Sequence, residues 1–158
     1  MNAASITEIK RELKTLDEET LMNHCLRLAK FKKDNKELLT YLLFESNDED
    51  SYVAMIKEEI EDSFDEINQT HIYYAKKSIR KILRNLTKYI RYSGQKQTEV
   101  EILLCFCETM RDSGINYKRS TVLHNLYLNQ VNKVKKAMNT LHEDLRYDYE
   151  EAFYQLTN

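Results

Sequence analysis

Proline is absent from this 158-residue sequence, and glycine occurs twice, at Gly94 and Gly114. A β-sandwich or a parallel α/β domain of this length needs many more turn-forming residues, so both classes are disfavoured. Apolar residues make up 42% and charged residues 32% of the chain, which excludes a disordered protein. We therefore expect an all-α fold of seven or eight helices, as an up-and-down bundle or a HEAT-like array, in a single domain over residues 1–158.

Long apolar runs are also lacking. The longest, Leu42–Phe44 and Ile102–Cys107, are far too short to cross a membrane. The first residues contain no apolar segment typical of a signal peptide. Three cysteines are an odd number, which favours reduced thiols and a cytoplasmic location. We expect all three to be small core residues, namely Cys25, Cys105 and Cys107.

Capping residues and apolar spacing predict where the helices lie. Ser5 and Glu8 have the spacing of a capping box, and Thr15 or Asp17 is expected to cap the second helix. The later helices are expected over the ranges 36–45, 49–67, 71–92, 98–112, 119–141 and 142–156. The helix over 36–45 is apolar on most sides, which is typical of a buried helix.

Three further positions bear on the helix ends. Thr98, three residues before Glu101, is expected to cap the helix over 98–112, and Thr70 the helix over 71–92. Gly94 is suited to the left-handed conformation that ends a helix.

Charge is distributed unevenly along the chain, although the net charge is only -2. Residues 48–70 carry nine acidic side chains and one basic one, whereas residues 71–98 carry eight basic side chains and no acidic one. At 100° per residue the cations of the second block share one helix face, with tyrosines beside them. This candidate anion- or partner-binding face comprises Lys77, Arg80, Lys81, Arg84, Lys88, Arg91, Tyr73 and Tyr92.

Three interpretations of this face stay open. The acidic helix over 49–67 should pack antiparallel to the basic one, so the two sets of charges could neutralise each other. The face could instead bind an acidic protein partner. It could also bind nucleic acid, since cations contact phosphates and aromatic rings stack on bases.

Catalytic and metal-binding motifs are not found. The sequence contains no HExxH, CxxC, Glu-x-x-His, Walker A, GxGxxG or GxSxG pattern. The carboxylates at 58–66 fall on a face expected to be solvated, where burial cannot separate their pKa values for acid–base catalysis. We therefore expect no enzyme, no cofactor, no metal site and no small-molecule substrate.

The last helix suggests self-association. Tyr147 and Tyr154 are seven residues apart and fall opposite its apolar stripe, and tyrosine is enriched at interfaces. An isolated pair of surface tyrosines is the alternative.

Two segments, Leu39–Glu45 and Lys88–Gly94, resemble small helical bacterial proteins with no assigned activity. The resemblance implies a helical fold and no particular chemistry. The sequence as a whole predicts a non-enzymatic cytoplasmic interaction or scaffold protein that binds another protein or itself. The alternative is a nucleic-acid-binding module that uses the basic helix 71–92.

Overall fold

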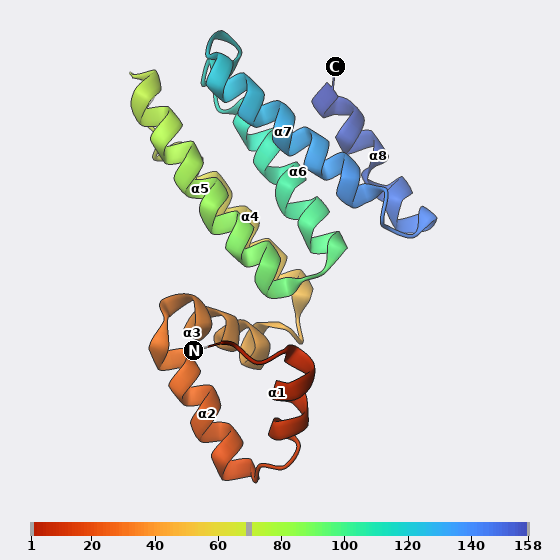
Figure 1. Ribbon diagram of the computed structural model, residues 1–158. Helices are drawn as coiled ribbons and strands as arrows, with labels where there is room; N and C mark the ends of the chain where they lie inside the picture. The colour runs from red at the N-terminus through yellow and green to blue at the C-terminus, as the bar shows by residue number, and fades with distance from the viewer. Residues whose placement is uncertain (1, 69–70, 158) are drawn as a thin grey trace. The chain divides into compact units, whose positions relative to one another are not determined.

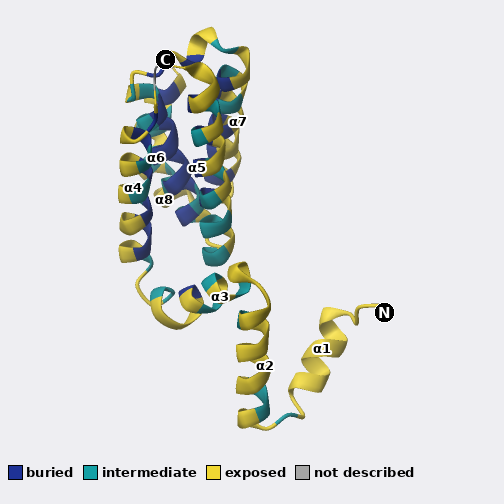
Figure 2. Cartoon of the chain, turned by 90° about the vertical axis from the view of Figure 1, so that its left-hand side faces the viewer, coloured by how far each residue is buried: buried dark blue, intermediate teal, exposed yellow. Residues whose placement is uncertain are grey.

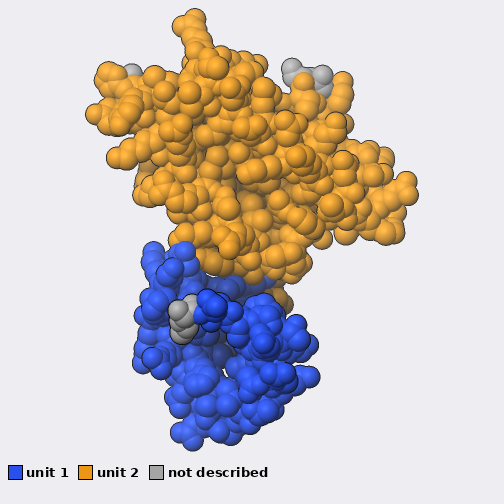
Figure 3. Space-filling view, in the orientation of Figure 1, with its two compact units in different colours: residues 1–43 blue, residues 44–158 orange. Residues whose placement is uncertain are grey.

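The computed structural model describes residues 2–68 and 71–157, and its regular structure is helical throughout (Figure 1). Helices account for 82% of these residues, far above the one-third typical of globular proteins, and no strand lies among them. The described ranges contain eight α-helices, which confirms the all-α prediction. They fall into two compact units, residues 1–43 and 44–158 (Figure 3). That the whole chain forms a single domain stays a prediction.

The first unit contains three short helices, two of which begin at side-chain caps. They are α1 (Ile6–Leu13), α2 (Glu18–Phe31) and α3 (Lys33–Thr40). Ser5 and Glu8 form the expected capping box, in which each side chain accepts a hydrogen bond from the other's backbone N–H. Asp17 caps α2 by accepting a hydrogen bond of 2.8 Å from the Thr20 amide. These local predictions are confirmed.

The prediction that residues 36–45 form a buried helix is wrong. This segment comprises the end of α3 and a π-helical turn at Tyr41–Glu45. Tyr41 is its one buried residue, whereas Leu42 and Leu43 are exposed. Within its unit α3 packs against α2, and a single neighbouring helix covers only one side of an apolar helix.

The second unit is an up-and-down bundle whose successive helices run antiparallel (Figure 1). They are α4 (Glu49–Asp65), α5 (Ile72–Ser93), α6 (Lys96–Asp112), α7 (Thr121–Met138) and α8 (Glu143–Thr157). A short 3₁₀ turn, Tyr117–Arg119, precedes α7. The central helix is α6, which packs against α4, α5, α7 and α8. The buried residues lie on the facing sides of α4 to α7 (Figure 2).

The buried sides of α4 and α5 are apolar stripes with helical spacing. On α4 the buried residues are Tyr52, Val53, Ile56, Ile60 and Phe64, and on α5 they are Ala75, Ile79, Ile82 and Leu86. Phe64 also packs against Phe106 of α6, with ring centroids 5.5 Å apart. Gly94 ends α5 with φ +68°, the left-handed conformation expected from the sequence.

The prediction that Thr98 caps α6 is wrong. The helix begins two residues earlier, at Lys96, and its N-cap residue Gln95 makes no side-chain capping bond. Thr98 is buried and donates a hydrogen bond to the Glu49 carboxylate of α4. A tertiary partner thus uses the hydroxyl group that the local pattern assigned to a cap. The other expected cap, Thr70, lies outside the described residues.

Candidate functional site

The predicted cations of α5 lie on the side of the helix opposite its buried stripe. Five of them are exposed to solvent, and we call them the basic face: Lys77, Arg80, Lys81, Arg84 and Arg91. At 1.5 Å per residue, α5 is about 33 Å long. The basic face extends along most of this length, because Lys77 lies in its second turn and Arg91 in its last.

The other members of the predicted set have different surroundings. Lys88 is half-buried and has an interaction partner. Tyr92 is half-buried, and its ring packs against that of Tyr89 at 6.5 Å. Tyr73 is 68% exposed, and its ring lies 5.5 Å from that of Tyr74. Exposed aromatic surface is therefore concentrated at the N-terminal end of α5.

Acidic side chains occupy the corresponding outer side of α4. We call the exposed ones the acidic face: Glu58, Glu61, Asp62, Asp65 and Glu66. They lie opposite the stripe that contains Ile56 and Ile60. The two charged faces therefore belong to neighbouring antiparallel helices and are both open to solvent.

The two faces are not joined by close ion pairs between described residues. Among these residues, no member of either face takes part in an ion pair within 4.0 Å. Intramolecular neutralisation at longer range, which the sequence left open, stays a prediction.

Other side chains join the two helices. The Tyr52 hydroxyl donates to the Tyr89 backbone oxygen at 3.1 Å, and the Tyr89 hydroxyl donates to the Glu59 carboxylate at 3.1 Å. Ser93 donates to Glu49 one turn nearer the same end of both helices. A groove of about 240 Å³ follows the same seam, and its lining includes Lys81 of the basic face together with Glu59 and Glu66 of α4. The side-chain hydrogen bonds named above across the seam are made by hydroxyl groups.

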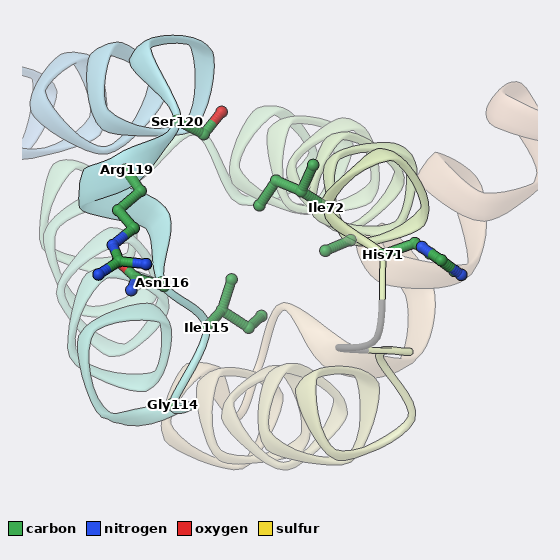
Figure 4. Close-up of a pocket in the computed structure, with 8 residues that line it drawn as sticks. His71, Ile72, Gly114, Ile115, Asn116, Arg119 and Ser120 are labelled. Carbon is green, nitrogen blue, oxygen red and sulfur yellow. The ribbon is translucent and has the colours of Figure 1, made fainter.

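A larger cleft of about 650 Å³ lies between the start of α5 and the segment that precedes α7 (Figure 4). Ile72 and Ile115 point toward its centre, Arg119 and Asn116 line one wall, and His71 points away. Its polar lining consists of His71, Asn116, Arg119 and Ser120, without a carboxylate or a thiol among the lining residues.

Metal-binding clusters are not found in the described part of the chain, where no three His, Cys, Asp or Glu side chains are placed to hold an ion. The same residues include no helix that is both long and apolar enough to span a membrane.

The cysteines divide into two kinds. Cys105 and Cys107 are buried in α6 as expected, and burial raises the pKa of the Cys107 thiol to about 12. The prediction that Cys25 is a core residue is wrong, because it is exposed on α2. It lines an apolar pocket of about 230 Å³ that Leu28 and Leu38 also line. Within the described part of this unit, α3 is the helix that packs against α2, and it leaves Cys25 exposed.

A polar cluster that the sequence did not reveal joins three helices. Lys57 of α4 lies 2.7 Å from the Glu101 carboxylate of α6, and the Tyr149 hydroxyl of α8 donates to that carboxylate at 2.8 Å. Burial raises the pKa of Glu101, but the hydrogen bonds from Lys57 and Tyr149 outweigh it, so that the pKa is lowered overall. Each partner is more than 40 residues away in the sequence, so no local pattern could have identified the cluster.

On α8 the structure places Tyr147 and Tyr154 at exposed positions. On the opposite side Leu156 is buried as expected, whereas Leu145 is exposed. The tyrosines are thus accessible, and their use in self-association stays a prediction.

Comparison of the chain with protein-family models, with curated proteins and with solved structures finds no match.

Proposed function

We propose that this protein is a non-enzymatic interaction or scaffold protein of the cytoplasm, and that the basic face of α5 binds an acidic surface of another protein chain. One observation carries the proposal: five cations are exposed along one helix, and none is in an ion pair with a described residue. A face of like charges without counter-charges repels itself, and an acidic partner removes that repulsion.

A protein partner is favoured over nucleic acid by the neighbouring acidic face. Packed helices lie about 8–10 Å apart, which is close to the Debye length of about 8 Å at physiological ionic strength. A duplex bound along α5 would therefore be repelled by the acidic face of α4. A narrower acidic helix can contact α5 alone.

Nucleic acid is the second candidate, and it is supported by the aromatic cluster at the start of α5. Tyr73 is exposed beside Tyr74, and exposed rings next to cations are suited to base stacking. Single-stranded nucleic acid would meet less repulsion from α4 than a duplex, because it has fewer phosphates per unit length.

The test compares two probes, fluorescently labelled poly-L-glutamate and a labelled oligonucleotide, by anisotropy at low salt. The variant R80E/R84E is expected to weaken binding of poly-L-glutamate by about tenfold or more. A matched control, K133E/K136E, changes the net charge equally on the exposed side of α7. The control should bind nearly as the wild type does.

Two outcomes would contradict the proposal. An equal loss of affinity for poly-L-glutamate in R80E/R84E and in K133E/K136E would show that net charge, and not the basic face, determines binding. Tighter binding of the oligonucleotide, with a log–log salt slope near about -4 to -5, would favour the nucleic-acid candidate, because that slope corresponds to about five neutralised phosphates.

A further inference from the structure

The charges on α4 and α5 are in register along the two helices. The side-chain bond between Glu49 and Ser93 places these two residues at the same level of the antiparallel pair. One turn further along both helices, the hydrogen bond from the Tyr52 hydroxyl to the Tyr89 backbone oxygen gives nearly the same register. Both helices rise 1.5 Å per residue, so equal steps forward on α4 and backward on α5 reach residues at equal levels.

Counting in this way from Glu49 and Ser93 matches four of the five members of the acidic face with four of the five members of the basic face. Glu58 is level with Arg84, and the same count gives the further matches Glu61 with Lys81, Asp62 with Arg80, and Asp65 with Lys77. All eight side chains are exposed, and the described residues supply no ion pair to any of them.

We infer that the acidic partner of the basic face is the acidic face of a second copy of this chain. A two-fold axis parallel to the helices would place α4 of one copy opposite α5 of the other without changing their levels. Each acid would then face its matched cation, and the symmetry would form every match twice. This inference rests on the proposed function, because it names the partner of the same face.

Charge pairs alone are weak, so the apolar surface beside them matters. Exposed ion pairs contribute about 0–1 kcal/mol each and are screened by salt. Met55 is 48% exposed, one turn before Glu58, on the outer side of α4. It would be covered in the assembled pair, where it adds apolar contact. The charges would then mainly set the register and exclude other arrangements.

Charge exchange between copies provides the test. The variant E58K/D62K/D65K makes both faces basic, and K77E/R80E/R84E makes both faces acidic. Each variant alone should sediment as a monomer, whereas the wild type should form a dimer that dissociates as salt is raised from about 50 mM to 500 mM. An equimolar mixture of the two variants should form a heterodimer, because each reversed face meets an opposite one. We expect about a 100-fold loss of self-association in each variant and recovery to within about tenfold in the mixture.

A monomeric mixture of well-folded variants would overturn the inference. Far-UV circular dichroism checks folding, and the single variants E58K and R84E provide the same exchange if a triple variant is unfolded. Binding of poly-L-glutamate distinguishes a failure of the dimer inference from a failure of the proposed function. If E58K/D62K/D65K still binds it and K77E/R80E/R84E does not, while the mixture stays monomeric, the basic face has an acidic partner other than a second copy. If neither the wild type nor E58K/D62K/D65K binds it, the proposed function fails as well.

Discussion

Lys57 Nζ lies 2.7 Å from a carboxylate oxygen of Glu101, and this contact fixes α4 to α6 in the half-buried layer of the bundle. Tyr149 of α8 approaches the same carboxylate from another side. Because three helices converge on one group, Glu101 is expected to contribute more to the stability of the second unit than an exposed ion pair would.

Replacing Glu101 with Gln should make stability less sensitive to acid. The pKa of Glu101 is lowered below its ordinary value of 4.5, so the folded state favours the ionised form. This contribution is present above the unfolded-state pKa and is lost as pH falls through the lower folded-state pKa. E101Q should therefore cost about 1–3 kcal/mol at pH 7, with the difference from wild type shrinking below about pH 4.5. Urea unfolding at several pH values measures it, and a pH-independent difference would contradict the prediction.

One of the three thiols should react quickly in the native protein. Cys25 is exposed, whereas Cys105 and Cys107 are buried, and burial raises the pKa of both buried thiols. Reaction with a chromogenic disulfide should show one fast equivalent, and all three after denaturation. C25S should remove the fast phase. Fast reaction that persists in C25S would show that α6 is accessible.

Gly94 provides a test of backbone conformation without side-chain contact. Its φ is +68°, and a Cβ added there would have no atom within 4 Å. G94A should therefore lower the free energy of unfolding by about 1–2 kcal/mol through conformation alone. G94N should cost less, because Asn adopts the left-handed region more readily. T87A, at an exposed position of the same helix, is the control, and equal losses in G94A and T87A would contradict the argument.

A separate prediction concerns self-association through the exposed tyrosines of α8. Tyr147 is 75% exposed, and Tyr154 is also exposed. If self-association uses α8 instead of α4 and α5, replacing both with Glu should lower the oligomeric state while leaving the helix content unchanged. Sedimentation velocity and circular dichroism measure the two quantities. An unchanged sedimentation profile would show that α8 is not a self-association interface.

The sequence predicted well what depends on neighbours in the chain. Each confirmed cap depends on residues only a few positions apart, so the spacing in the sequence was enough to predict it. These caps are the capping box of Ser5 and Glu8, the N-cap at Asp17 and the helix end at Gly94. The stripes of α4 and α5 were also predictable, because helices of these lengths bury one side whatever their exact neighbours are.

The sequence predictions that were wrong share one cause. Whether a side chain is buried or paired depends on residues that are distant in the sequence. Leu42 has the apolar character of a core residue, but its exposure is decided by how many helices surround it. Thr98 matched a capping pattern, yet its hydroxyl donates to Glu49, on another helix. For the same reason the sequence could not decide whether Arg80 and Arg84 form ion pairs with α4, because this depends on how the two helices pack.

The central position of α6 has a consequence for the order in which the bundle is completed during synthesis. The helix is followed in the sequence by two of the helices that cover it, α7 and α8, so it is synthesised before half of its partners. Phe106, Cys107 and Met110, all fully enclosed in the finished bundle, lack these covering helices until α7 and α8 have been added. A released chain truncated after Asp112 should therefore bind a hydrophobic dye or a chaperone, and extension through Thr157 should abolish that binding.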